Sequence, residues 1–262
     1  MKSNNKDNVS RLYELVPSSL LERPPVDINA IGSYLGVQEV VVRPLNIPGF
    51  LRVVGDGKSI VFLNEENPAR RQRFTHAHEI GHLLLSGHGE GEIFCREATM
   101  NPKALERACD AVATEILMPR RVFGNTANRF GWTLDSVRQL ASYFEVSLTA
   151  AAIRLFELIQ EPMAISYWRV RQDVRKYLKQ IWLRTNEFGR PLKPDFRTRP
   201  RLDTAEPINL AIDGYGMKAG ATKVLLTQDG ITRSGTMLTE ALGIGSGRNR
   251  TILAFHYLSR SL

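Results

Sequence analysis

The sequence has few cysteines and no long apolar run, and each absence excludes a class of protein. Its two cysteines, Cys95 and Cys109, are too few for a disulfide framework, and neither stands in the paired spacing of a zinc knuckle. No apolar run approaches the roughly 18 residues that a transmembrane helix needs, and the polar residues 1–7 do not resemble a signal peptide. We therefore expect a cytoplasmic protein with free thiols and no membrane contact.

The remaining composition is that of a globular protein, but its charge is unevenly distributed. The chain of 262 residues is 43% hydrophobic and 24% charged, which allows a sizeable core and more than one domain. Residues 1–119 carry 13 Lys+Arg against 15 Asp+Glu, whereas residues 120–262 carry 22 against 12. Residues 166–201 alone hold 11 basic and 3 acidic side chains, which favours weak contact with nucleic acid or an acidic partner. A solvated charged segment without a ligand is the alternative.

Histidine is also scarce, yet two of the five histidines stand four residues apart in a helix predicted over residues 73–85. Residues four apart share one helix face, so His78 and His82 can direct two imidazole nitrogens at one metal ion. Glu79 lies beside that point, where the general base of a metal-dependent peptidase stands. A helix with two unrelated histidines is the alternative, but the pattern predicts a zinc peptidase helix.

A catalytic zinc ion needs a third protein ligand, and a second predicted helix over residues 102–118 offers one. Glu106 is the predicted ligand. Asp110, one turn later on the same face, is predicted to accept a hydrogen bond from the free ring nitrogen of a liganding histidine. Glu115 is the competing acid, but it lies about 180° round the helix from Glu106, so the two cannot share one ion. An ordinary solvated helix face is the alternative for Glu106 and Asp110.

The order of these motifs resembles that of the ImmA/IrrE metallopeptidases, and in particular the IrrE-like radiation-response members. The resemblance spans residues from about 25 to 160 and rests on the stretches 71–85, 105–110, 116–119 and 129–131, followed by a helix-turn-helix-like segment. It implies an α+β, zincin-like (gluzincin) peptidase domain. It also implies the site roles already assigned, with Glu79 as base and the ligands His78, His82 and Glu106.

The resemblance further implies a cofactor and a substrate. The expected ion is Zn²⁺, although Mn²⁺ or Fe²⁺ can occupy the same donors in the cell. Such proteins cleave a helix-turn-helix (XRE-type) transcriptional repressor and so induce stress or DNA-damage response genes. Two other functions stay open: a nucleic-acid- or protein-binding regulator that keeps the peptidase fold as a scaffold, and a component of a toxin–antitoxin system.

The residues before the metal motif predict two helices and a small sheet. Apolar spacing predicts a helix over residues 9–21 that Pro17 splits or kinks. Asp27 is predicted to cap a second helix. Valine-rich residues 37–43 predict a strand, and residues 50–64 predict a hairpin. A strand at the edge of this sheet, beside the metal, is a candidate to hold the substrate chain.

Two further histidines lie near the motif. His76 points about 200° round the helix from His78, so we expect it to pack away from the metal. His88 lies in a glycine-rich loop, where it is either solvated or an electrophile for the oxyanion.

Residues 132–156 predict two helices joined by a short turn, in the pattern of a helix-turn-helix. Four apolar residues are predicted to form their shared core: Leu140, Ala141, Val146 and Leu155. The second helix offers Thr149 and Arg154 for base contacts but is otherwise apolar. A scaffold or protein-docking role is therefore favoured over sequence-specific DNA binding.

The remaining chain is less regular. Residues 162–182 predict a basic helix whose aromatic side chains suit a core or, alternatively, single-stranded nucleic acid. Residues 186–207 predict a linker, and the resemblance implies a small α/β, GAF-like sensor domain after it. The predicted domains are a peptidase domain over 1–123, a helix-turn-helix-like domain over 124–160, and a basic helix, linker and sensor domain over 161–262.

Overall fold

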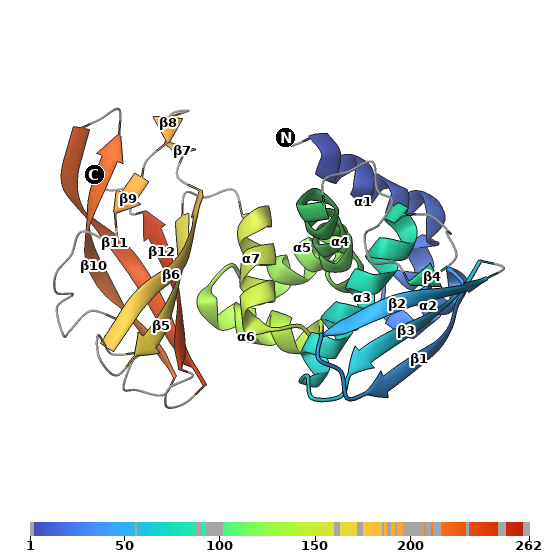
Figure 1. The fold of residues 1–262 in the computed structure, drawn as a ribbon. Coiled ribbons are helices and arrows are strands. Elements are labelled where there is room, and N and C mark those ends of the chain that lie inside the picture. The colour runs from blue at the N-terminus through green and yellow to red at the C-terminus, as the bar shows by residue number, and fades with distance from the viewer. Residues whose placement is uncertain are drawn as a thin grey trace. The chain divides into compact units, whose positions relative to one another are not determined.

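The protein is described here by a computed structural model in which two compact units are distinguished (Figure 1). The described residues are 3–55, 57–86, 91–92, 102–159, 163–171, 175–184, 186–187, 190–191, 193–195, 207, 211, 216–228, 231–245 and 250–258. One unit comprises Met1–Phe130 and Gln139–Arg154, and the other comprises Gly131–Arg138 and Leu155–Leu262. None of the helices in the described residues combines the length and apolarity needed to cross a bilayer.

The first unit begins with short helices whose ends follow from local sequence. Helix α1 (Ser3–Leu15) stops before Pro17, and a single 3-10 turn, η1 (Ser18–Leu20), follows it. The predicted interruption is confirmed, because a proline ring disfavours helical conformation in the residue before it. Helix α2 (Ile28–Tyr34) begins after Asp27, whose side chain accepts a hydrogen bond from the Ala30 amide at 3.1 Å. The predicted cap is also confirmed.

A four-stranded sheet follows, in the order β1-β3-β2-β4. Its strands are β1 (Val37–Arg43), β2 (Gly49–Gly55), β3 (Lys58–Asn64) and β4 (Gly91–Glu92). Strands β2 and β3 form the predicted antiparallel hairpin, and β1 pairs with β3 in parallel. Alternate side chains face one side, where they pack with the helix that follows; this core consists of Val37, Leu51, Val53, Val61, Leu63 and Leu83.

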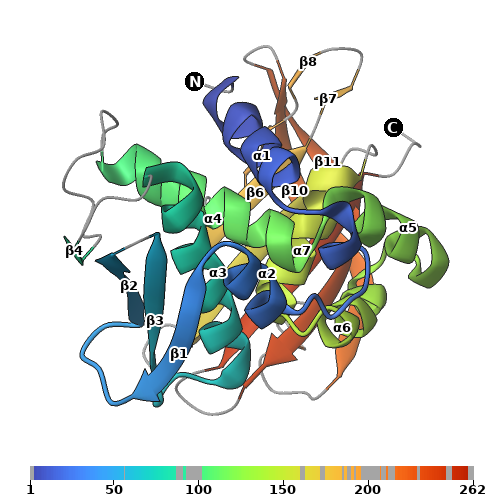
Figure 2. The same cartoon turned by 90° about the vertical axis from the view of Figure 1, so that its right-hand side faces the viewer.

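One long helix lies against this sheet, and a second long helix packs on the first. Helix α3 (Ala69–Ser86) packs on β2 and β3, and helix α4 (Pro102–Leu117) packs on α3, so α3 lies between the sheet and α4 (Figures 1 and 2). The two helices approach closely at Gly81, where an added Cβ would stand 3.0 Å from the Cα of Cys109. The Cys109 side chain is a thiol, not part of a disulfide, with no exposed surface. This close approach sets the distance between the two helices that carry the candidate metal ligands.

Three further helices complete the helical part: α5 (Arg120–Phe130), α6 (Leu134–Tyr143) and α7 (Leu148–Leu158). Helices α6 and α7 lie where the sequence predicts them, and all four predicted core residues are buried. In the turn between them Glu145 adopts a φ of 52°, a left-handed conformation that usually requires glycine. Their identity as a DNA-binding motif stays a prediction.

In the second unit the sequence prediction was wrong over residues 162–182. These residues form no helix in the described ranges; they form the hairpin of β5 (Met163–Arg171) and β6 (Arg175–Arg184). The hairpin belongs to an antiparallel sheet of order β6-β5-β12-β11-β10-β9. Its other strands are β9 (Lys193–Asp195), β10 (Met217–Gln228), β11 (Ile231–Ile244) and β12 (Thr251–Leu258).

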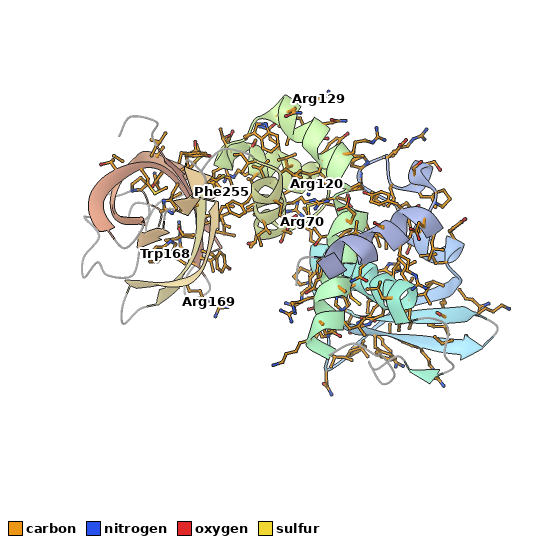
Figure 3. All side chains as sticks on the ribbon, turned by 90° about the horizontal axis from the view of Figure 1, so that it is seen from above. Arg70, Arg120, Arg129, Trp168, Arg169 and Phe255 are labelled. Carbon is orange, nitrogen blue, oxygen red and sulfur yellow. The ribbon has the colours of Figure 1, made fainter. Side chains whose placement is uncertain are left out.

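Burial on both faces explains the error. Strand β5 lies inside the sheet, and Ile165 and Ser166, which face opposite sides, both have no exposed surface. Trp168 and Phe255, on neighbouring strands, likewise face opposite sides and are buried (Figure 3). A strand covered on both faces lacks the alternation that distinguishes it from a helix.

The predicted linker over residues 186–207 contains three short strands among its described residues: β7 (Asn186–Glu187), β8 (Arg190–Pro191) and β9. The strands β10, β11 and β12 follow this region in the chain. The boundaries of the three predicted domains and the GAF-like assignment stay predictions.

A row of polar side chains crosses the interior of this second sheet. His256 contacts the Ser166 hydroxyl through Nε2 at 2.6 Å and the Thr239 hydroxyl through Nδ1 at 2.8 Å. All three residues have no exposed surface. Burial lowers the pKa of His256 to about 3, so the imidazole is neutral at physiological pH.

Candidate metal centre

Three predicted ligands converge at one point between α3 and α4. The Nε2 atoms of His78 and His82 lie 3.1 Å apart. The Glu106 carboxylate reaches both rings, with Oε2 3.3 Å from His78 Nε2 and Oε1 3.4 Å from His82 Nε2. The structure therefore brings together the two histidines of one helix and the glutamate of the next.

These separations fit a zinc ion. For metal–ligand distances of about 2.0–2.1 Å, the ligand atoms of a tetrahedral site lie roughly 3.3 Å from one another. The three separations of 3.1, 3.3 and 3.4 Å lie around this value. Two imidazole nitrogens and one carboxylate also suit Mn²⁺ or Fe²⁺, so the donor set fits a divalent cation. Three protein ligands leave a fourth position for water or substrate.

Asp110 lies where the sequence predicts, one turn after Glu106. Its Oδ1 is 2.9 Å from Nδ1 of His78, so His78 donates its Nδ1 proton there and directs the lone pair of Nε2 at the metal point. Burial lowers the pKa of His78, but the Asp110 hydrogen bond and the nearby carboxylates outweigh it and raise the pKa overall. Burial, together with the neighbouring His78, lowers the pKa of His82.

Glu79 is buried beside the ligands, with 6% of its surface exposed. Burial raises its pKa to about 7; His78 opposes this shift, Glu106 adds to it, and a hydrogen bond from the Leu51 backbone opposes it. A carboxyl group with a pKa near neutrality can both take and return a proton at physiological pH. The Leu51 contact comes from β2, so the sheet helps to orient this side chain.

Of the two other histidines near the motif, one lies among the described residues. His76 is 4% exposed and packs away from the ligands, near Gly32 and Val37, as expected. Burial, followed by the nearby Arg73, lowers its pKa to about 4. His88 and the second cysteine, Cys95, lie outside the described residues.

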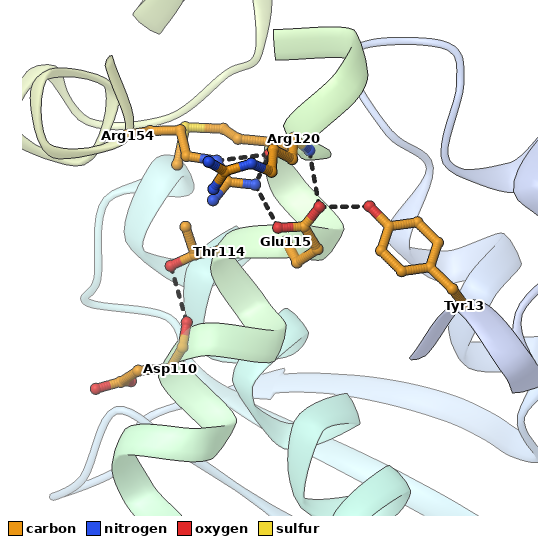
Figure 4. Close-up of polar contacts among 7 residues, drawn as sticks. Tyr13, Asp110, Thr114, Glu115, Arg120 and Arg154 are labelled. Carbon is orange, nitrogen blue, oxygen red and sulfur yellow. Dashed lines mark hydrogen bonds and ion pairs between the residues drawn. The ribbon is translucent and has the colours of Figure 1, made fainter. Parts of the chain in front are cut away.

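Glu115, the competing acid, faces away from the metal point. Its carboxylate pairs with the Arg154 guanidinium, and both side chains are almost fully buried (Figure 4). Arg154 also donates to the carbonyl oxygen of Met118 at 2.8 Å from Nη2. Arg154, which the sequence offered as a residue for base contacts, is therefore not available for them, because its guanidinium is enclosed in the protein. A lone arginine in an otherwise apolar helix was the signal that could have indicated a buried ion pair.

The site contains two histidines four residues apart, a glutamate from the following helix and a buried glutamate beside them. This set of residues is typical of a metallopeptidase-type domain. Residues 37–156 match the family described as Peptidase_M78, IrrE N-terminal-like domain. Together with the relatives below, this match shows that residues 37–156, which make up less than half of the chain, are similar to the ImmA/IrrE family.

Two similar proteins carry the description radiation response metalloprotease IrrE. The protein of Deinococcus radiodurans is 35% identical over 112 residues, which cover 42% of this chain and 34% of that protein. The protein of Deinococcus deserti is 26% identical over 205 residues, which cover 75% of this chain and 70% of that protein. The chain thus spans about a third of the first relative's length and more than two thirds of the second's.

A solved structure described as a Mycobacterium tuberculosis transcriptional regulator is similar in fold. Its TM-score is 0.56 at 10% identity, and the match covers 98% of this chain and 77% of that one. At this identity the likeness concerns the fold alone.

Proposed function

We propose that the chain is a zinc-dependent regulatory endopeptidase that cleaves a helix-turn-helix (XRE-type) repressor in the cytoplasm and so induces stress or DNA-damage response genes. The observation that carries the proposal is the convergence of His78, His82 and Glu106 beside the buried Glu79. The peptidase family supports a protein substrate, and the radiation-response description of the relatives supports a regulatory one.

The chemistry divides between the cation and the chain. A divalent cation held by the three ligands supplies the charge that acidifies water and polarises a peptide carbonyl. Glu79, buried beside the ligands, would take the proton of the attacking water and return it to the leaving amine. Asp110 keeps the Nδ1 proton of His78 in place and so maintains the Nε2 lone pair toward the cation.

The test combines one catalytic variant with one ligand variant. Glu79→Gln keeps the size of the side chain and the metal ligands but removes the base, so it should bind zinc normally and lose cleavage of a candidate repressor. His78→Ala should lose both zinc and cleavage. Wild-type protein that is fully loaded with zinc and leaves the repressor intact would contradict the proposed substrate. A gene-induction response that survives Glu79→Gln but not His78→Ala would instead favour a binding regulator built on the peptidase fold.

A further inference from the structure

The buried ion pair between Glu115 and Arg154 lies on the side of α4 opposite the metal ligands. The side chains are only 6% and 5% exposed, respectively. Arg154 contacts Glu115 through Nη2 and donates to the Met118 carbonyl through Nε at 3.0 Å and Nη2 at 2.8 Å. The guanidinium thus joins α7 to the last turn of α4 by several bonds in a fixed geometry.

The other carboxylate oxygen of Glu115 is also occupied. It accepts hydrogen bonds from the Tyr13 hydroxyl and from the backbone N–H of Arg120 at 2.7 Å (Figure 4). Glu115 therefore connects α4 with α1, with the start of α5 and with α7. With both oxygens engaged, rotation of α4 about its axis or sliding along it would strain these bonds.

We propose that Glu115 and Arg154 are positioning residues that fix α4 so that Glu106 meets His78 and His82. This inference rests on the proposed metallopeptidase function. Glu106 lies nine residues before Glu115, which is two and a half turns and about 180° round the helix. One face of α4 thus carries the metal ligand Glu106, and the opposite face carries the anchor, which is the ion pair between Glu115 and Arg154.

The geometry shows why the anchor matters for the ligand. With the Glu106 carboxylate at a radius of roughly 6 Å from the helix axis, a rotation of about 10° displaces it by roughly 1 Å. Metal–ligand distances tolerate only about 0.2 Å. A small rotation of α4 is therefore enough to weaken the site, even though the ion pair touches neither the ligands nor a substrate.

A second ion pair acts on the other ligand-bearing helix. Arg73 of α3 contacts Glu145, in the turn between α6 and α7, at 3.5 Å and donates to the Val26 carbonyl at 3.0 Å. The α6–α7 segment therefore contacts α4 through the buried ion pair and α3 through a partly exposed one. This gives the helix-turn-helix-like segment a role in the peptidase unit that requires no DNA.

The decisive variant replaces both members of the buried pair, Glu115→Gln with Arg154→Met. Because no buried charge is left unpaired, the fold is expected to survive, whereas Arg154→Met alone leaves Glu115 buried without its partner. The matched control is Glu22→Gln with Arg121→Met, which removes an exposed ion pair elsewhere in the same unit. Arg154→Lys tests whether charge alone, without the planar guanidinium, restores the effect.

Three readouts separate positioning from general stability: the zinc dissociation constant by chelator competition, the visible spectrum of the cobalt-loaded protein, and kcat and KM for repressor cleavage. The double variant should melt near wild type but bind zinc roughly ten- to a hundredfold more weakly, with an altered cobalt spectrum. The kcat of the double variant should fall while its KM stays constant. The control variant should match wild type in all three readouts. Arg154→Lys should recover part of the zinc affinity.

A double variant with wild-type zinc affinity and cobalt spectrum would overturn the inference, whether or not the repressor is cleaved. The metal measurements need no substrate. If the wild-type enzyme binds zinc but leaves the repressor intact, only the proposed substrate is refuted. Wild-type protein that binds no divalent metal would overturn both proposals.

Discussion

Gly81 is the position where a single methyl group should disturb the candidate metal centre most directly. It lies between Glu79 and His82 on α3, and a Cβ there would stand 3.0 Å from Cα, 3.1 Å from O and 3.2 Å from Cβ of Cys109 on α4. Ordinary carbon contacts lie at about 3.5–4.0 Å, so Gly81→Ala should push the helices apart by roughly 0.6 Å. Glu106 lies three residues before Cys109 and should move with it.

The expected magnitudes follow from that shift. A displacement of roughly 0.6 Å exceeds the tolerance of about 0.2 Å in metal–ligand distances, so zinc affinity should fall roughly tenfold or more. Overpacking costs about 1–3 kcal/mol, whereas alanine in place of glycine favours a helix by up to about 1 kcal/mol. The free energy of unfolding should therefore fall by roughly 1–2 kcal/mol.

The assays are zinc titration against a chromophoric chelator and urea unfolding of the metal-free protein. Gly32→Ala is the matched control, because its Cβ would meet its nearest neighbours, His76 and Val37, at 3.4 Å, close to ordinary contact. Cys109→Gly should not rescue Gly81→Ala, since backbone atoms make the two shortest contacts. A Gly81→Ala protein that is more stable than wild type and binds zinc equally well would refute the reasoning.

Three further predictions test other contacts. Asp110→Asn should weaken zinc binding by roughly ten- to a hundredfold, because the amide no longer holds the Nδ1 proton of His78 as strongly; an unchanged dissociation constant would argue against this role. The pKa of His256 is about 3 in the fold against its usual 6.5, so the unfolded chain takes up the proton first, and stability should be lost as pH falls below 6.5, by at most about 1.4 kcal/mol per pH unit. Urea unfolding at pH 7 and pH 5 should show this loss in wild type and a smaller one in His256→Gln. Asp27→Ala should cost about 1 kcal/mol in urea unfolding through loss of the cap on the Ala30 amide, while Asp27→Ser should retain most of that stability.

The features that the sequence predicted correctly depend on residues close together in the chain. Residues His78 and His82 share a face because of helical period, and the cap at Asp27 acts over three residues. The convergence of Glu106 on the histidines needed one further step, the packing of α3 on α4, which the motif spacing and family resemblance together supplied. These signals are local or carried by a recurrent motif.

The features that the sequence did not reveal depend on distant partners. Arg154 meets Glu115 39 residues away, so nothing within its own helix identifies that partner. The strand β5 is an inner strand of a sheet whose other strands lie later in the chain, with β12 beginning at Thr251. In both cases tertiary burial decided the outcome, and local propensity could not.

The buried thiol at the contact between α3 and α4 gives the protein an internal reporter. Cys109 has no exposed surface and stands directly against Gly81, so a thiol reagent can reach it only when the two helices separate. In a Cys95→Ser background, the rate of alkylation of Cys109 would therefore measure how often α3 and α4, which carry the metal ligands, separate. Zinc bound by His78, His82 and Glu106 should slow this alkylation, because it stabilises the packed state of the two helices.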